Sequence, residues 1–375
     1  MSKKIIVAGH ICLDITPVFS QTKMSDIAQV FVPGSLLSMK GVSIHTGGIV
    51  SNTGMGLKKL GADVCLMGKV GQDDFGAIVM KKLKEMNIDD GMIVSENENT
   101  SYSVVLAPPS IDRIFLHDPG ANDTFGYEDI DFHKIEDAAV FHFGYPPIMK
   151  KMYEQDGAEL IRIFKRVKEM GVATSLDLAA VDENSDAGKA DWYKILSKVL
   201  PYVDFFMPSL EELAFMMDRE FYHALRKRAG NQDMTLFVKQ EEVEVLAQKM
   251  LDLGSKVVLI KCGAKGMYLK TASSEILSQI SKEVMNDPEG FGNRAQFEKS
   301  FVPDQVLSAT GAGDTSCGAF LYAMTEGYSL EICLKLATAT GASCVSAYDA
   351  ISGLQPFSVL LEKIEQGWEK QNISK

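Results

Sequence analysis

The chain has 375 residues, of which 46% are hydrophobic and 23% are charged, a composition typical of a folded globular protein. At about 150 residues per domain, this length allows one large domain or two to three smaller ones. Lys and Arg number 38 and Asp and Glu number 50, giving a net charge of −12 that argues against nucleic acid as a partner. The six cysteines include no Cys-x-x-Cys pair, so we expect neither a zinc site nor a disulfide framework.

The hydrophobic segments are all short. None approaches the roughly 18 apolar residues that a membrane span requires. The apolar run at residues 5–8 is followed at once by Gly9-His10 and Asp14, which is too brief for a signal peptide. We therefore expect a cytoplasmic protein with no membrane partner.

Short apolar runs alternate with longer amphipathic ones along most of the chain. The predicted strands are residues 4–8, 64–70, 138–143, 172–176, 203–207 and 256–261. Several are nearly continuous in Val, Ile, Leu and Phe, as expected for parallel strands that are covered on both faces. The spacing predicts helices over 74–86 and 154–170, the second ending at Gly171. This alternation predicts an α/β fold with a central, mostly parallel sheet.

Two regions break the alternation, at roughly 15–45 and 98–118. Residues 101–107 and 113–117 flank a Pro-rich turn and resemble a hairpin, so both regions together predict a small β-sheet lid. The stretches 218–246 and 272–300 are polar and are expected to be irregular surface insertions. The whole chain, 1–375, is thus expected to form a single α/β domain with a lid.

The most informative motif is Thr310-Gly311-Ala312-Gly313-Asp314, which precedes a run with helical spacing. Glycines at a helix N-terminus present unpaired N–H groups that suit a phosphate or a developing negative charge. Asp314 in the first turn is placed to take a proton from an attacking hydroxyl. The same residues also fit a plain capped helix, with Thr310 as N-cap and Asp314 favouring the helix dipole. On physical grounds alone both interpretations stay open.

This motif resembles the C-terminal signature of the PfkB/ribokinase family of carbohydrate and nucleoside kinases. The resemblance implies a ribokinase-like three-layer α/β/α fold with a central, mostly parallel sheet and a small β-sheet lid. It also implies that Asp314 is the catalytic base. The backbone of Gly311, Ala312 and Gly313 would then form the anion hole for the transferred phosphoryl group.

An upstream motif carries the resemblance to the substrate side. The run from Gly47-Gly48 to Asn52 resembles the family's N-terminal Gly-Gly element, and Asp14 matches the Asp after its first strand. The resemblance implies that Asp14, Gly47, Gly48 and Asn52 hold sugar hydroxyls. Arg113, in the lid hairpin, is a candidate for contacting the substrate. A solvated charge on the hairpin is the alternative for this residue.

Further matches concern the nucleotide and metal. The turn Lys261-Cys262-Gly263-Ala264-Lys265-Gly266 resembles the one that lines the family's nucleotide pocket. The nucleotide-binding residues that the resemblance implies are Lys261, Gly263, Gly266 and Thr310. Glu212 matches the family's Glu that acts on Mg²⁺ through water, so ATP and Mg²⁺ are the expected cofactors. Ser308 replaces an Asp linked to a monovalent-cation site, which puts activation by a monovalent cation in doubt.

The leading hypothesis is a kinase that moves the γ-phosphoryl group of ATP to a hydroxyl of a sugar or sugar derivative. A nucleoside kinase is an alternative, with Phe19, Phe31 and Tyr102 as the aromatic residues available to hold a base. A catalytically silent sugar-binding regulator is another, because Ser308 and Ser209 depart from the family pattern. The first strand is followed by no Gly-x-Gly-x-x-Gly, which argues against a dinucleotide-dependent oxidoreductase. Apolar lid strands favour a homodimer formed through the lid.

Overall fold

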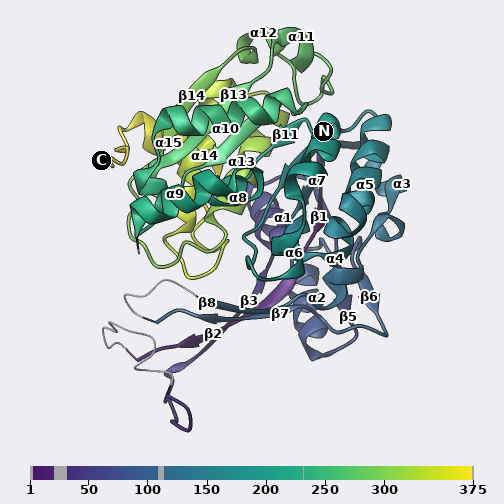
Figure 1. Cartoon of the computed structure of the whole chain (residues 1–375), viewed down its shortest axis with the longest axis vertical. Helices are drawn as coiled ribbons and strands as arrows, with labels where there is room; N and C mark the ends of the chain where they lie inside the picture. The colour runs from purple at the N-terminus through teal and green to yellow at the C-terminus, as the bar shows by residue number, and fades with distance from the viewer. Residues whose placement is uncertain (1–2, 21–31, 109–113, 231, 374–375) are drawn as a thin grey trace.

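The computed structural model describes residues 3–20, 32–108, 114–230 and 232–373. An eight-stranded sheet with the order β14-β13-β12-β11-β10-β9-β1-β4 forms its centre (Figure 1). The strands from β12 to β4 pair in parallel, whereas β13 and β14 are antiparallel. Their bounds are β1 Lys4–Gly9, β4 Val64–Met67, β9 Ala138–Gly144, β10 Ala173–Asp177, β11 Phe205–Phe206, β12 Val257–Lys261, β13 Gly266–Thr271 and β14 Ala295–Lys299. The predicted α/β fold with a mostly parallel sheet is confirmed.

Both faces of this sheet are buried, which explains why its strands are almost continuously apolar. In β1, Ile5 and Val7 pack into one hydrophobic cluster and Ile6 and Ala8 into the other, because successive side chains of a strand point to opposite faces. Helices cover each face (Figure 1). The first cluster takes side chains from α1 Ile49–Leu60, α2 Asp74–Glu85, α13 Ala312–Thr325, α14 Leu330–Cys344 and α15 Phe357–Glu365. The second takes them from α5 Ala158–Glu169, α7 Trp192–Val199, α8 Leu210–Met217, α9 Arg219–Ala229 and α10 Gln240–Asp252.

The expected strand 203–207 is reduced to β11, and two other predicted elements differ more clearly in their bounds. The expected strand 64–70 divides into β4 and β5 Lys69–Gly71, and β5 pairs with β6 Ile93–Ser95 in a separate two-stranded sheet. The new pairing begins where the Ile93 N–H donates to the Gly68 carbonyl at 2.9 Å. The expected helix 154–170 begins only at Ala158, because Gln155 and Asp156 have φ values of 51° and 57° that no right-handed helix accommodates.

The polar stretches contain more regular structure than their composition indicates. Residues 218–246 include α9 and the start of α10, and Leu225 and Ala229 of α9 are buried. Residues 272–300 include strand β14, which pairs with β13 at the edge of the central sheet. The remaining short helices are α3 Phe132–Ile135, α4 Lys150–Tyr153, α6 Asp186–Lys189, α11 Ser274–Leu277 and α12 Pro288–Phe291. In the described part of the chain, no helix combines the length and apolarity needed to cross a membrane.

A second sheet projects from the body, in the order β3-β2-β7-β8 (Figure 1). Its strands are β2 Cys12–Val18, β3 Gly41–Gly47, β7 Tyr102–Leu106 and β8 Ile114–Asp118. They come from the two regions that were expected to form the lid. The register places Asp14 beside His45 and Ser103, and Ser103 beside His117. These four side chains therefore share one face of the lid.

Candidate active site

The polar side chains of interest gather where the parallel strands end. The register pairs Gly9 with Gly144 and Gly144 with Asp177, so β1, β9 and β10 end at one level. Lys261 ends β12 at the same edge. The N-termini of α1 and α13 lie here as well, because the contacts of Asn52 and Thr53 with Asp314 join the two helices. In an open α/β sheet, this carboxyl edge is where ligands bind.

Helix α13 begins with glycine rather than with the threonine proposed as its cap. Its N-cap is Gly311, at φ 72°, a left-handed conformation that glycine adopts at little cost. A Cβ at Gly311 would also clash with the side chain of Ala350. The expectation of Thr310 as N-cap is therefore wrong. The Thr310 N–H donates to Ser308 Oγ at 3.1 Å.

Asp314 is buried in the first turn of α13, with a relative exposure of 4%. Asn52 Nδ2 donates to its Oδ2 at 2.8 Å, and the Tyr145 hydroxyl lies 2.8 Å from both carboxylate oxygens. The Thr53 hydroxyl donates to its backbone carbonyl at 3.1 Å. Neutral donors therefore hold this carboxylate in one orientation. A general base needs such positioning to take a proton from its substrate.

Tyr145 was not among the residues chosen from the sequence. It follows β9 and adopts φ 69° and ψ 35°, a left-handed conformation that is costly for a bulky residue. Burial, and next the charge of Asp314, raise the pKa of Tyr145 well above its ordinary value. The phenol thus stays protonated and acts as a donor to Asp314. Its one sequence signal is the run Gly144-Tyr145-Pro146-Pro147 at the end of a buried strand.

The residues predicted to hold the substrate lie together. A Cβ at Gly47 would clash with the Asp14 carboxylate, and one at Gly48 would lie 2.6 Å from both Nδ1 and the carbonyl oxygen of His10. Gly48 is the N-cap of α1, with φ 83°, and Asn52 lies one turn further along that helix. Asp14, Gly47, Gly48 and Asn52 are thereby brought to one place beside Asp314. Arg113 lies outside the described residues.

Two histidines join the lid to the body at this place. His10 Nε2 and His117 Nε2 are 3.3 Å apart, and Ser103 Oγ lies 3.0 Å from His117 Nδ1. Burial lowers the pKa of both histidines, and the proximity of His117 lowers that of His10 further. Both rings are therefore neutral near pH 7, and the pair offers hydrogen-bond donors and acceptors rather than charge.

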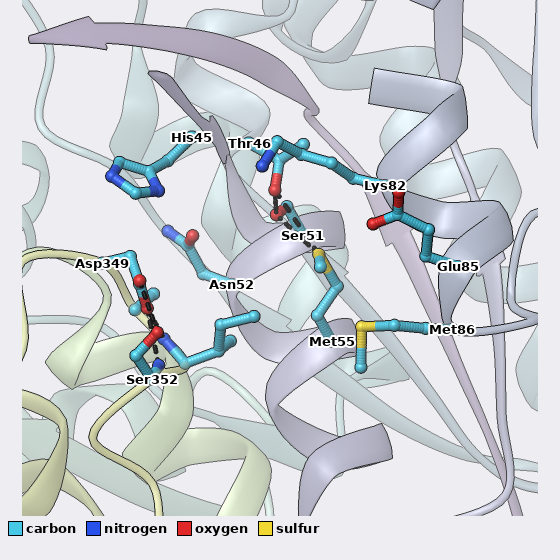
Figure 2. Close-up of a pocket in the computed structure, with 12 residues that line it drawn as sticks. His45, Thr46, Ser51, Asn52, Met55, Lys82, Glu85, Met86, Asp349 and Ser352 are labelled. Atoms are coloured by element: carbon cyan, nitrogen blue, oxygen red, sulfur yellow. Dashed lines mark hydrogen bonds between the residues drawn. The ribbon is translucent and has the colours of Figure 1, made fainter. Parts of the chain in front are cut away.

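A cavity of about 330 Å³ adjoins Asn52 (Figure 2). In Figure 2, His45, Asn52 and Asp349 lie on one side of it, with Lys82 and Glu85 of α2 opposite. Burial lowers the pKa of His45. Like His10 and His117, His45 is therefore neutral near pH 7 and offers hydrogen bonds rather than charge to the cavity. The cavity has the volume of a small polar ligand.

A buried ion pair lies beside the first turn of α13. Lys261 Nζ is 2.7 Å from both carboxylate oxygens of Asp177. Burial raises the pKa of Asp177 to about 7, against the opposing charge of Lys261. Burial also disfavours the charged form of Lys261, yet the Asp177 carboxylate outweighs it and the pKa of Lys261 is raised. Burial opposes charge on both groups, and the 2.7 Å contact between them is what favours the ion pair. Asp177, like Tyr145, was missed by the sequence reasoning.

The residues predicted to bind the nucleotide and the metal lie in the turn after β12 and at the start of α8. Gly263 and Gly266 form the turn between β12 and β13, where the Cys262 N–H donates to the Gly266 carbonyl at 2.8 Å. Glu212 and Ser209 form a capping box at the start of α8, in which the Ser209 N–H donates to Glu212 Oε2 at 2.8 Å. Among the residues described, no three His, Cys, Asp or Glu side chains are grouped to hold a metal. Mg²⁺ usually keeps several waters and takes few protein ligands, so these residues fit an indirect role for Glu212.

A model of the pfkB family of carbohydrate kinases matches residues 2–356 of this chain. The chain belongs to the PfkB family. Among curated PfkB-family relatives, it is 23% identical over 370 residues to the 5-dehydro-2-deoxygluconokinase of Clostridium beijerinckii, covering 98% of this chain and 94% of that protein. It is 26% identical over 332 residues to the ribokinase of Arabidopsis thaliana, covering 86% of this chain and 72% of that one.

Solved structures of the family show the same fold. The structure of Arabidopsis thaliana ribokinase complexed with ribose and ATP has a TM-score of 0.69 at 22% identity, covering 96% of this chain and 98% of that one. The nucleoside kinase of Methanocaldococcus jannaschii has a TM-score of 0.63 at 20% identity, covering 98% of this chain and all of that one (100%). The expected ribokinase-like fold is confirmed, and the chain is a carbohydrate kinase of the PfkB family.

Proposed function

We propose that this kinase transfers the γ-phosphoryl group of ATP to a hydroxyl of a sugar or sugar derivative, with Asp314 as the general base. The observation that carries the proposal is the buried Asp314 carboxylate, oriented by Asn52 and Tyr145 at the N-terminus of α13. In the reaction, the substrate hydroxyl gives its proton to Asp314 and its oxygen bonds to the γ-phosphorus. The bond from phosphorus to the bridging oxygen breaks, and its electron pair leaves with ADP.

The remaining roles follow from position. The N–H groups of Ala312, Gly313 and Asp314 belong to the first turn of α13 and would bind the phosphoryl oxygens in the anion hole that begins at Gly311. The Ala312 N–H would give up its long, 3.4 Å contact with the Ala309 carbonyl to do so. Asp14, Gly47, Gly48 and Asn52 would hold the hydroxyls of the acceptor, with Arg113 as a further candidate. Lys261, Gly263, Gly266 and Thr310 would line the nucleotide site. Mg²⁺, when bound, neutralises phosphate charge, and Glu212 would hold its water ligands.

A sugar fits the lid better than a nucleoside does. The row of Asp14, His45, Ser103 and His117 presents polar groups to the site. Tyr102, one of the aromatic residues available to hold a base, lies on the other face of β7, where its ring contacts Phe75 of α2 edge-on at 5.6 Å. Phe19 is buried, and Phe31 lies outside the described residues.

Phosphoryl transfer from ATP and Mg²⁺ to a panel of sugars, sugar acids and nucleosides tests the proposal, with and without K⁺. Asp314→Asn removes the base and keeps the side-chain shape, so we expect a fall in kcat of at least about a hundredfold. Sugar and nucleotide binding, measured by calorimetry, should survive in that variant. An Asp314→Asn enzyme with wild-type kcat would eliminate Asp314 as the base. Sugar binding without turnover in the wild type would favour the silent regulator.

We also propose that two copies associate through their lids. The face of the lid opposite the site exposes large apolar side chains on its outer strands, namely Val42, Ile44, Ile114 and Leu116. Burying them against a second copy would remove apolar surface and two strand edges from water. The double variant Ile44→Lys, Leu116→Lys should then elute as a monomer when the wild type elutes as a dimer. A monomeric wild type at assay concentration contradicts this assembly.

A further inference from the structure

The Lys261 side chain runs alongside the proposed anion hole. It leaves the end of β12, and its exposure is 11%. A Cβ placed on Gly313 would lie 3.2 Å from Lys261 Cδ and 3.7 Å from Nζ. The glycine at position 313 therefore leaves the space in which the ammonium reaches the first turn of α13. The cation and the Gly313 N–H lie close enough to contact one anion together.

The surroundings of this ammonium are acidic. The carboxylates of Asp177, Glu212 and Asp314 all lie near Lys261, and each of them raises its pKa against the effect of burial. One cation among three carboxylates leaves an excess of negative charge in a poorly solvated place. A positive contact besides the one that Mg²⁺ would provide would stabilise a phosphoryl group entering there, and Lys261 is in position to supply it.

The hydrogen bonds of the pair leave capacity for such a contact. Within the described part of the chain, Lys261 Nζ donates its hydrogen bonds to Asp177, although an ammonium has three N–H donors. The Leu178 N–H also donates to Asp177 Oδ1, at 2.8 Å. The ammonium can thus keep one bond to Asp177 while another N–H turns to a phosphoryl oxygen.

A second buried Lys–Asp pair on neighbouring strands shows the contrasting, structural arrangement. Lys256 precedes β12 at its other end and pairs with Asp204 at 2.7 Å. Asp204 is fully buried and also receives Lys168, the Thr174 N–H and the Thr174 hydroxyl. Lys256 lies away from the carboxyl edge of the sheet and from Gly313, so it serves as a matched control.

We propose that Lys261 is a catalytic residue whose ammonium donates a hydrogen bond to the transferred phosphoryl group, and that Asp177 is the positioning residue that holds it beside Gly313. The proposal rests on the proposed function. Lys261 gains and loses no proton in the step: the hydroxyl proton still goes to Asp314, and the electron pair still leaves with ADP. The ammonium stabilises charge on the phosphoryl oxygens as the bond to ADP breaks.

The test compares Lys261→Met with Lys256→Met, which remove one buried ammonium each at similar side-chain length. Calorimetry with Mg²⁺ measures affinity for a non-hydrolysable ATP analogue and for ADP, and steady-state kinetics measure kcat and KM. In Lys261→Met we expect kcat to fall about a hundredfold or more. We also expect the preference for the ATP analogue over ADP to fall about tenfold while ADP affinity stays close to wild type. Lys256→Met should lower Tm and leave both readouts unchanged.

Lys261→Met leaves a buried carboxylate without its partner and is at risk of not folding. Lys261→Met, Asp177→Asn removes both charges and should fold with the same loss of analogue preference. Unchanged kcat and unchanged preference in a folded Lys261 variant would overturn the proposal. So would equal losses in Lys256→Met, which would reduce the effect to stability. If no acceptor is phosphorylated by the wild type, the proposed function fails, and the calorimetric comparison still decides the role of Lys261 toward the γ-phosphate.

Discussion

The phenol of Tyr145 lies 2.8 Å from each carboxylate oxygen of Asp314, although the two residues are 169 positions apart in the chain. Tyr145 reaches this place because it leaves β9 in a left-handed conformation, with its N–H directed at the Asp177 carbonyl at 3.3 Å. Its hydroxyl and the amide of Asn52 together hold the carboxylate in one orientation. A substrate hydroxyl that approaches Asp314 must share these oxygens with the phenol.

Tyr145→Phe removes this hydroxyl and keeps the ring that packs near His10. Because a poorly oriented base costs rate, we expect kcat to fall by about tenfold to a hundredfold with a smaller change in KM. Tyr153→Phe, which also removes a phenol but lies against Trp192, is the control and should keep wild-type kcat. Equal kcat in the two variants would mean that the Tyr145 contact has no part in catalysis.

Gly48→Ala tests the close approach of the substrate loop to His10. The added Cβ would meet His10 Nδ1 and its carbonyl oxygen at 2.6 Å, so His10 and the start of α1 must shift. We expect the affinity for the sugar, measured by calorimetry, to fall at least about tenfold. Gly171→Ala is matched in φ, since Gly171 has φ 79°, with open space around it. That control should lose about 1 kcal/mol of stability and no affinity. Similar sugar affinity in both variants would contradict the prediction.

His142 predicts a pH dependence of stability. Burial, and to a lesser extent the charge of Lys261, lower the pKa of His142 from 6.5 to about 3. The unfolded chain therefore takes up a proton below pH 6.5 that the folded protein refuses until near pH 3. This residue lowers the free energy of unfolding as the pH falls through that range, by up to about 1.4 kcal/mol per pH unit. Above pH 6.5 it adds no dependence.

Urea unfolding at pH 7 and pH 5 checks this, comparing the wild type with His142→Asn. The Asn side chain can keep the contact with Ser175 Oγ, which lies 2.9 Å from His142 Nδ1, and it does not titrate. The stability of the variant should decrease less between the two pH values than that of the wild type. His133→Asn, at a side chain with 94% exposure, should behave as the wild type does. Parallel pH dependences for all three proteins would disprove the assignment.

Asp204→Asn tests the structural ion pairs at the far end of the sheet. The change leaves the ammonium groups of Lys168 and Lys256 beside a neutral side chain. Because an unpaired buried charge is costly, we expect the free energy of unfolding to fall by about 3–5 kcal/mol, with kcat retained at temperatures where the variant is folded. Asp156→Asn breaks exposed pairs with Lys194 and Lys198 and should change neither quantity measurably. A loss of kcat in folded Asp204→Asn would show that this pair also affects the site.

Elements whose signal lies in neighbouring residues could be predicted from the sequence. Buried strands such as Ala138–Gly144 can be predicted from their continuous apolar residues. The helix after Gly311 can be predicted from the glycines at its start and the helical spacing of its apolar residues. The stretch 272–300 was harder, because β14 lies at a sheet edge and is half exposed, which leaves little apolar pattern to detect.

The sequence by itself determined the α/β class, the lid strands and the order of the Gly47-Gly48 and Gly311–Asp314 motifs, because these are properties of neighbouring residues. Only the tertiary structure decided that Tyr145, Asp177 and Lys261 join Asp314. Tyr145 follows β9, and Asp177 and Lys261 end β10 and β12. They meet because the sheet order brings those carboxyl ends to one edge beside α13. The local sequence does not reveal these contacts, since each depends on a partner far away in the chain: 169 residues for Tyr145 and Asp314, and 84 for Lys261 and Asp177.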